Sequence, residues 1–154
     1  MAYGFNTSNV YYDVSQVPGR LRGLVALGFK RLASYNYFQI REAQTVAMQT
    51  LGISVAFADD LRTWWKWAPS SYSAISFSTQ WGHDEDIIVV RNRESFDDAK
   101  LVHLIMHELS HILLNHPSHV MRPTSVLWPI TTQRQTLDSG DRQMFHARFG
   151  RGML

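Results

Sequence analysis

The sequence predicts an α+β fold in a single domain spanning residues 1–154, and two observations lead to this expectation. With 154 residues, 45% of them hydrophobic and 18% charged, the chain has the size and composition of one domain with one core. Its hydrophobic pattern also changes along the chain from a helical period to alternation and back. The resulting order is helix, helix, three strands, helix, helix, which is typical of α+β folds.

The N-terminal third is predicted to be irregular and then helical. Residues 1–16 carry no periodic pattern. From Leu21 to about Leu51 the apolar residues recur at helical spacing, with a break at residues 34–38, which are rich in Tyr and Asn. We therefore expect two N-terminal helices.

Three strands are predicted to form a small twisted sheet. Ile53–Ala58 and Ala74–Thr79 alternate in the manner of half-buried strands, and Asp86–Arg91 is more apolar. A mostly apolar strand is typical of a sheet interior. Since the second strand is the more polar, we expect it at the edge of the sheet.

The segment 59–73, between the first two strands, holds Trp64, Trp65 and Trp67. Core packing is the ordinary role of such residues. Three tryptophans within four residues cannot all face one side, however. We therefore expect some of them to be exposed as a surface that binds a partner.

The strongest helix is predicted to begin near Ser95, which with Asp98 forms a start similar to a capping box. It continues as FDDAKLVHLIMHELSHILLNH and is stopped by Pro117. Residues 118–139 are expected to be irregular. The last predicted helix is Asp141–Phe149, closed by Gly150.

Composition excludes several classes of function. The chain has no cysteine, so disulfides, Cys-ligated zinc, iron–sulfur clusters and a thiol nucleophile are excluded. The formal net charge is +2 and no block of Lys and Arg occurs, so direct binding of nucleic acid is not indicated. No targeting segment or apolar run of about 20 residues is visible. We expect a cytoplasmic protein that does not enter a membrane.

The residues with the clearest chemistry are H-E-L-S-H at 107–111. Positions four apart lie on one face of a helix, so His107 and His111 can reach one metal ion. Zinc with three protein ligands keeps one position open for catalysis and lowers the pKa of water that it binds. Glu108 lies beside the first histidine and is the candidate general base.

The alternative is an ordinary helical protein in which the motif occurs by coincidence. Its two histidines would then lie on the surface, and its glutamate would be exposed. This alternative fits poorly, because the helix around the motif is almost entirely apolar. Such a helix would bury polar groups without compensation. The sequence therefore favours a metal site, and we expect the ion to be Zn²⁺.

The third ligand is less well defined. The extended motif H-E-x-x-H-x-x-G-x-x-H requires Gly at 114 and His at 117. This chain has Leu114 and Pro117 there, so that class is excluded. The candidates that remain are His116 and His119 after the helix and Asp138 and Asp141 near the last helix.

His103 lies one turn before His107 and faces roughly the same side of the helix. We consider it a tentative substrate-binding or oxyanion-stabilising residue. A histidine on the helix face with a polar neighbour is an equally good interpretation.

The chain resembles the ImmA/IrrE family of zinc metallopeptidases from about Arg41 to the C-terminus. The similarity comprises a helix ending at LGI, a strand with a turn before IIVVRN, and LVHLIMHELSHILLNH. It continues in the last helix, where DRQMFHARFG is similar to the family pattern E-A-N-x-F-A-x-x-L-L. Aligning Phe145 with the family's phenylalanine puts Asp141 at the glutamate position, so the resemblance implies Asp141 as the third zinc ligand.

The resemblance further implies a zincin-like core, with a small twisted sheet over the HELSH helix. It implies a cytoplasmic zinc endopeptidase that acts on a protein or peptide, such as a helix-turn-helix repressor in phage, mobile-element or stress regulation. Any such repressor would be a separate partner. The alternative is a catalytically weak or inactive zinc-binding module that sequesters a regulatory protein.

Overall fold

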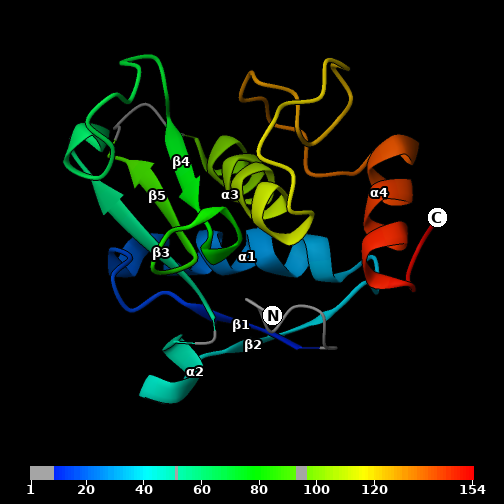
Figure 1. Ribbon diagram of the computed structural model, residues 1–154, viewed down its shortest axis with the longest axis horizontal. Helices are drawn as coiled ribbons and strands as arrows, with labels where there is room; N and C mark the ends of the chain where they lie inside the picture. Colours follow the sequence, from blue (N-terminus) through cyan, green and yellow to red (C-terminus); the bar gives the residue numbers. More distant parts are fainter. Residues whose placement is uncertain (1–8, 51, 93–96) are drawn as a thin grey trace.

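The computed structural model describes residues 9–50, 52–92 and 97–154, which form a mixed five-stranded sheet and four α-helices (Figure 1). The strands are β1 (Asn9–Asp13), β2 (Gln39–Glu42), β3 (Ile53–Ala58), β4 (Ala74–Phe77) and β5 (Ile87–Arg91). The α-helices are α1 (Arg22–Ala33), α2 (Val46–Thr50), α3 (Asp98–Leu113) and α4 (Ser139–Phe149). Short 3-10 helices cover Gly19–Leu21, Leu61–Thr63 and Thr79–Trp81. The predicted α+β class is confirmed.

The sheet has the strand order β2-β1-β3-β5-β4. The pairings β2–β1, β1–β3 and β3–β5 are parallel, whereas β4 pairs with β5 in the antiparallel sense. The more polar strand β4 is therefore at one edge, as predicted, and the apolar strand β5 is interior.

The prediction of three strands was wrong, because β1 and β2 extend the sheet to five. Strand β1 lies within the stretch 1–16 that we expected to be irregular, and β2 lies within the expected helical region. In β1 only Val10 and Tyr12 carry the apolar alternation, and Ile40 is the one aliphatic residue of β2. These patterns are too short to identify a strand, and both strands depend on tertiary pairing.

The first N-terminal helix, α1, ends at Ala33, and the chain then reverses at Asn36, whose φ is +67°. Asparagine is one of the few residues that adopt this left-handed conformation readily. The stretch 34–38 is thus a helix end, as predicted. The second predicted helix is reduced to the five residues of α2.

Each face of the sheet packs against a different layer. Val55, Ile88 and Val90 belong to the main hydrophobic core, together with apolar residues of α1 and α3. Their strand neighbours on the opposite face contact a smaller cluster that includes Leu61 and Ala68 from the segment 59–73. Successive side chains of a strand point to opposite faces of the sheet, so a continuous apolar run makes both faces apolar. This is expected for interior strands.

Helix α3 is the most deeply buried element, since every residue from Leu101 to Leu113 is buried. Its N-cap is Asp97, whose side chain accepts a hydrogen bond from the backbone N–H of Lys100. The predicted cap Ser95 lies outside the described residues. The helix ends at Leu113, ahead of Pro117, and Asn115 follows it with a φ of +49°.

The last helix begins two residues earlier than predicted. Asp138 is its N-cap, and the side chains of Asp138 and Asp141 form a capping box with each other's backbone N–H groups. The helix closes at Gly150 in a left-handed conformation, as expected. In the described part of the chain, no helix combines the length and apolar character needed to cross a membrane.

Close packing of α1 on α3 depends on a glycine. A Cβ atom placed on Gly28 would lie 2.5 Å from Ile105 Cγ2 and 2.7 Å from Ile105 Cβ. Non-bonded carbon atoms do not approach each other this closely in proteins. The β-branched side chain of Ile105 is also fully buried. The absence of a side chain at residue 28 thus allows α1 to lie directly against the helix that carries the histidines.

We expect Gly28→Ala to destabilise the protein by about 1–3 kcal/mol, because the added methyl group overpacks the helix contact. Gly23→Ala is the matched control, since Gly23 lies in the same helix with nothing within 4 Å of an added Cβ. The control should be neutral or stabilise the protein by up to about 1 kcal/mol. Urea unfolding of both variants measures the difference. Equal stability of the two would contradict the packing argument.

Candidate metal centre

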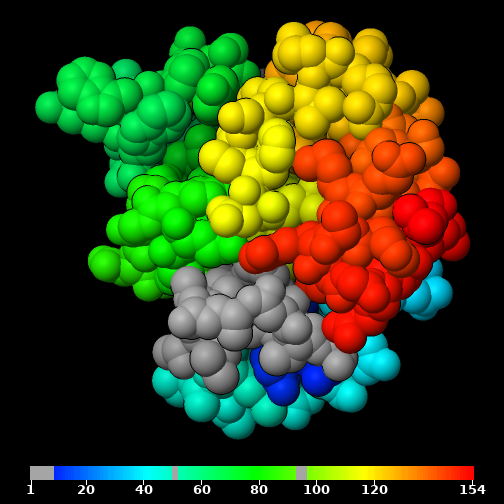
Figure 2. Space-filling view, turned by 45° about the vertical axis from the view of Figure 1, so that its right-hand side comes forward, coloured from blue at the N-terminus to red at the C-terminus, as the bar shows by residue number. Residues whose placement is uncertain are grey.

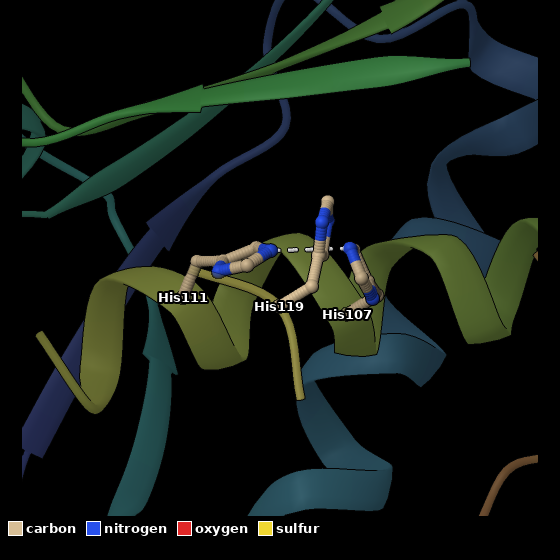
Figure 3. Close-up of side chains that lie close together, drawn as sticks. All are labelled: His107, His111 and His119. Carbon is tan, nitrogen blue, oxygen red and sulfur yellow. Dashed lines mark hydrogen bonds between the residues drawn. The ribbon is translucent and has the colours of Figure 1, made fainter. Parts of the chain in front are cut away.

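His107 and His111 lie one turn apart on α3, and both side chains are buried. Their Nε2 atoms face each other at 3.1 Å (Figure 3). Each ring is fixed from behind by a backbone carbonyl. His107 Nδ1 donates to the Val126 oxygen at 2.7 Å, and His111 Nδ1 donates to the His116 oxygen at 2.7 Å.

These contacts determine which ring nitrogen carries the proton. A carbonyl oxygen only accepts hydrogen bonds, so each Nδ1 must be protonated. Burial, followed by the neighbouring His111, lowers the pKa of His107 to about 3, and burial lowers that of His111 to about 4. Both rings are therefore neutral at pH 7, and each Nε2 carries a free lone pair close to the other Nε2.

Two nitrogen lone pairs this close, with their Nε2 atoms 3.1 Å apart, repel each other unless both are bound to a shared cation. Zinc–nitrogen bonds of about 2.0–2.1 Å at a tetrahedral angle separate two ligand nitrogens by about 3.3–3.4 Å. The observed spacing is close to that value. The pair therefore has the geometry of two ligands of one metal ion.

His119 completes a group of three imidazoles. It lies on the segment that follows α3, and its ring centroid is 5.4 Å from that of His107 and 5.2 Å from that of His111. One nitrogen from each of the three rings lies within 4.8 Å of the others. Figure 3 shows the His119 ring between the other two. Unlike them, it is exposed to solvent.

The other predicted third ligands lie elsewhere. Asp141, the ligand implied by the family resemblance, is fully buried at the start of α4, where its carboxylate contacts Ser125 and Val126. Asp138 caps α4 and pairs with Arg122. The side chain of His116 contacts the Ser118 carbonyl oxygen. Among the described residues, the structure thus brings His119 to the pair and not these three.

Glu108 is buried beside the histidine pair. Its Oε1 accepts a hydrogen bond of 3.3 Å from Ser76 Oγ on β4, and its Oε2 lies 3.9 Å from His107 Nε2. Because His107 is neutral, this contact is not an ion pair. Burial raises the pKa of Glu108 to about 8, and the Ser76 hydrogen bond offsets only part of this rise. A nearby cation would favour the ionised form of this carboxyl group.

The histidines and Glu108 line a cavity of about 850 Å³. One wall is β4 with residues 71–73 before it, and the other contains Pro117, His119 and residues 128–131. In Figure 2 the green segments around β4 and the yellow segment after α3 lie next to each other on this side of the molecule. A cavity of this size admits a segment of peptide.

His103 does not belong to this cavity. It is buried, its Nδ1 contacts the Arg134 carbonyl oxygen, and its Nε2 has no hydrogen-bond partner among the described residues. The ring centroid is 6.4 Å from that of His107, but His103 is not among the residues that line the cavity. Its position therefore does not support the tentative contact with substrate.

Two groups of the site were not identified from the sequence, namely Ser76 and the Val126 carbonyl. Ser76 could have been identified from the sequence, because it is a polar residue of an alternating strand. Its side chain faces the polar residues of α3. The Val126 carbonyl could not have been identified in this way, since any backbone oxygen of an irregular segment could equally accept the hydrogen bond from His107.

Comparison with known proteins adds no assignment. The chain matches no protein-family model and no curated protein. The three histidines, Glu108 and the cavity are therefore the features that bear on function.

We expect Glu108→Gln to stabilise the metal-free protein at alkaline pH by about 1–3 kcal/mol, because it removes a buried charge that has no cationic partner in the described part of the chain. The pKa of Glu108 rises from an ordinary 4.5 to about 8 on folding. Below pH 4.5 the carboxyl group is protonated in both the folded and the unfolded protein, so Glu108 does not lower the free energy of unfolding. As the pH rises from 4.5 through 8, this carboxyl group ionises more readily in the unfolded protein, and stability is lost.

The lowered pKa values of His107 and His111 affect the free energy of unfolding at acidic pH, where stability is lost as the pH falls below about 6.5.

Urea unfolding in the presence of a chelator, at pH 5 and at pH 8.5, measures this effect. The variant should match the wild type at pH 5 and exceed it at pH 8.5. Glu85→Gln is the control, because Glu85 is exposed. A constant difference between Glu108→Gln and the wild type at both pH values would show that the charge of Glu108 is not the cause.

Proposed function

We propose that the protein is a zinc-dependent endopeptidase similar to the ImmA/IrrE family. The observation that carries this proposal is the pair of neutral imidazoles whose bare Nε2 atoms lie 3.1 Å apart beside a buried glutamate. The same residues line a cavity next to an edge strand.

The donor set fits zinc. His107, His111 and His119 offer three imidazole nitrogens, which suit zinc better than they suit magnesium or calcium. Three protein ligands leave a fourth position, as catalytic zinc sites require. We therefore replace Asp141 by His119 as the proposed third ligand.

Zinc, when bound, polarises a carbonyl group and makes water more acidic. In the proposed reaction Glu108 accepts the proton of the attacking water and passes it to the nitrogen of the leaving amine. Its hydrogen bond to Ser76 Oγ fixes the orientation of the carboxyl group. The carbonyls of Val126 and His116 keep the two imidazoles in the tautomer that leaves Nε2 free.

The proposed substrate is a protein or peptide segment bound in an extended conformation along β4. This strand forms one wall of the cavity and has β5 as its partner on one side. An edge strand offers backbone hydrogen-bonding groups to an added segment. Family resemblance is the basis for naming a cytoplasmic helix-turn-helix repressor as a candidate substrate.

The alternative is a zinc-binding module that sequesters a regulatory protein without cleaving it. One observation favours this alternative. Trp64, Trp65 and Trp67 are 40%, 39% and 74% exposed, and Trp65 also lines the cavity. Exposed aromatic residues of this kind are typical of surfaces that bind a partner.

Zinc titration tests the proposed ligands. We expect His107→Ala, His111→Ala and His119→Ala each to weaken zinc binding by more than about 100-fold, since loss of an outer hydrogen-bond partner alone costs about 10–100-fold. His116→Ala is the control, because only the backbone of His116 contacts the pair. Competition with a chromophoric chelator measures the affinities. Unchanged affinity in His119→Ala would rule out this residue as the third ligand.

Hydrolysis of denatured casein and of a mixed peptide library tests the reaction. Glu108→Gln should keep one equivalent of zinc and lower the rate of cleavage by about 10²–10⁴-fold, because general acid–base catalysis contributes that amount. Equal rates for the variant and the wild type would contradict the proposed role of Glu108. Zinc binding without cleavage of any peptide by the wild type would favour sequestration.

A further inference from the structure

Asp141 has more contacts than a helix-capping residue needs. Its side chain is fully buried, and four donors approach its two oxygens. Oδ1 accepts from Ser125 Oγ at 2.6 Å and from Arg122 Nη2 at 3.3 Å. Oδ2 accepts from the backbone N–H of Val126 at 2.7 Å and from that of Asp138 at 3.3 Å. Only the last of these belongs to the capping box.

Two of the donors come from a tight turn at residues 125–128, which we call the 125–128 turn. Its backbone closes by a hydrogen bond from Trp128 N–H to the Ser125 oxygen at 3.1 Å, and Ser125 Oγ accepts from Leu127 N–H. Val126 and Leu127 are buried. Residues 114–138, all described, contain no helix or strand, so no ladder of backbone hydrogen bonds holds the turn in place.

The 125–128 turn contacts the candidate metal centre at two points. The Val126 oxygen accepts a hydrogen bond of 2.7 Å from His107 Nδ1. The Leu127 oxygen accepts a hydrogen bond of 3.0 Å from the backbone N–H of Val120, the residue after His119. The turn thus orients the ring of one proposed ligand and anchors the segment that carries another.

We infer that Asp141 is a positioning residue of the metal centre, because it holds the 125–128 turn and thereby orients His107 and His119 together. This inference rests on the proposed zinc site, but it gives Asp141 a different role from that of a ligand. Both carboxylate oxygens are occupied by donors from the chain, and the metal is reached through Val126 and Leu127.

A carboxylate suits this position better than an amide does. Oδ1 and Oδ2 each face donors only, and an ionised carboxyl group offers acceptors on both oxygens. Asparagine would turn one NH₂ group towards these donors and leave buried N–H or O–H groups without a partner. Arg122 adds a positive charge on the exposed side and also pairs with Asp138.

Glycine at residue 140 makes room for this arginine. A Cβ atom there would lie 2.5 Å from Arg122 Nη2 and 2.8 Å from its Cζ. The guanidinium group therefore occupies the space in which another residue would place its side chain. From this position Arg122 contacts both aspartates.

The test uses Asp141→Asn in the full chain, with two measurements. In the metal-free protein, ¹⁵N-resolved NMR of the histidine rings reports which nitrogen of His107 is protonated. We expect the wild type to show a single Nδ1–H tautomer and the variant to show a mixture. Zinc competition should show a loss of affinity of about 10–100-fold in the variant, as for other outer partners of zinc-bound histidines.

Two further variants separate positioning from stability. Phe145→Leu reduces packing in α4, where the ring stacks on Tyr37 at 5.0 Å, and should lower the melting temperature while keeping the tautomer and the zinc affinity. Ser125→Ala removes one contact of Asp141 and should shift both readouts in the direction of Asp141→Asn, by less. It remains informative if Asp141→Asn does not fold.

Each outcome decides the inference. Loss of zinc affinity with an unchanged His107 tautomer would show that Asp141 does not orient the His107 ring, and would overturn the inference that it positions both ligands together. Wild-type tautomer and affinity in both Asp141→Asn and Ser125→Ala would also overturn it. Failure of the wild type to bind zinc would contradict the proposed function, whereas the tautomer measurement, made without metal, would still test the positioning role.

Discussion

Burial of three polar side chains on one turn of helix α3 is the constraint on which the rest of the site depends. Two imidazoles and a carboxyl group lie in a helix that is buried from Leu101 to Leu113. Each buried polar group needs a hydrogen-bond partner, because an unmade hydrogen bond in the interior is costly. The surrounding chain supplies these partners from three separate segments, namely β4, the segment just after α3 and the 125–128 turn.

The same constraint explains the protonation states. Among the described residues no cationic side chain neutralises Glu108, and burial raises its pKa to about 8, while burial lowers the pKa values of both histidines. A site without metal is therefore uncharged at neutral pH, with two free lone pairs close to each other. A divalent cation would relieve this repulsion and favour the carboxylate form of Glu108.

Strongly periodic elements could be predicted from the sequence, and weakly periodic ones could not. The alternation of β3, the continuous apolar run of β5 and the long apolar face of α3 are local patterns, and the structure confirms all three elements. Strands β1 and β2 are short, pair in parallel and contain few apolar residues. Their existence depends on contacts between segments about 30 residues apart in the chain, which no local pattern encodes.

For the site, the sequence identified the residues whose geometry is set by one helix. The spacing of His107 and His111 fixes their relation whatever the rest of the chain does. His119 and Asp141 lie beyond an irregular stretch, so their positions depend on the path of residues 114–138. Asp141 was expected to be a zinc ligand. In the structure its carboxylate contacts Ser125 and Val126 instead.

The three histidines differ in how they are held. Two belong to a rigid buried helix, whereas His119 is exposed and belongs to a segment without helix or strand. An ion would therefore enter and leave on the side of His119, by displacement of the loop segment that carries this residue, while the helical pair stays in place. The lifetime of a bound ion would then reflect the opening rate of that loop and not the far slower unfolding of the domain.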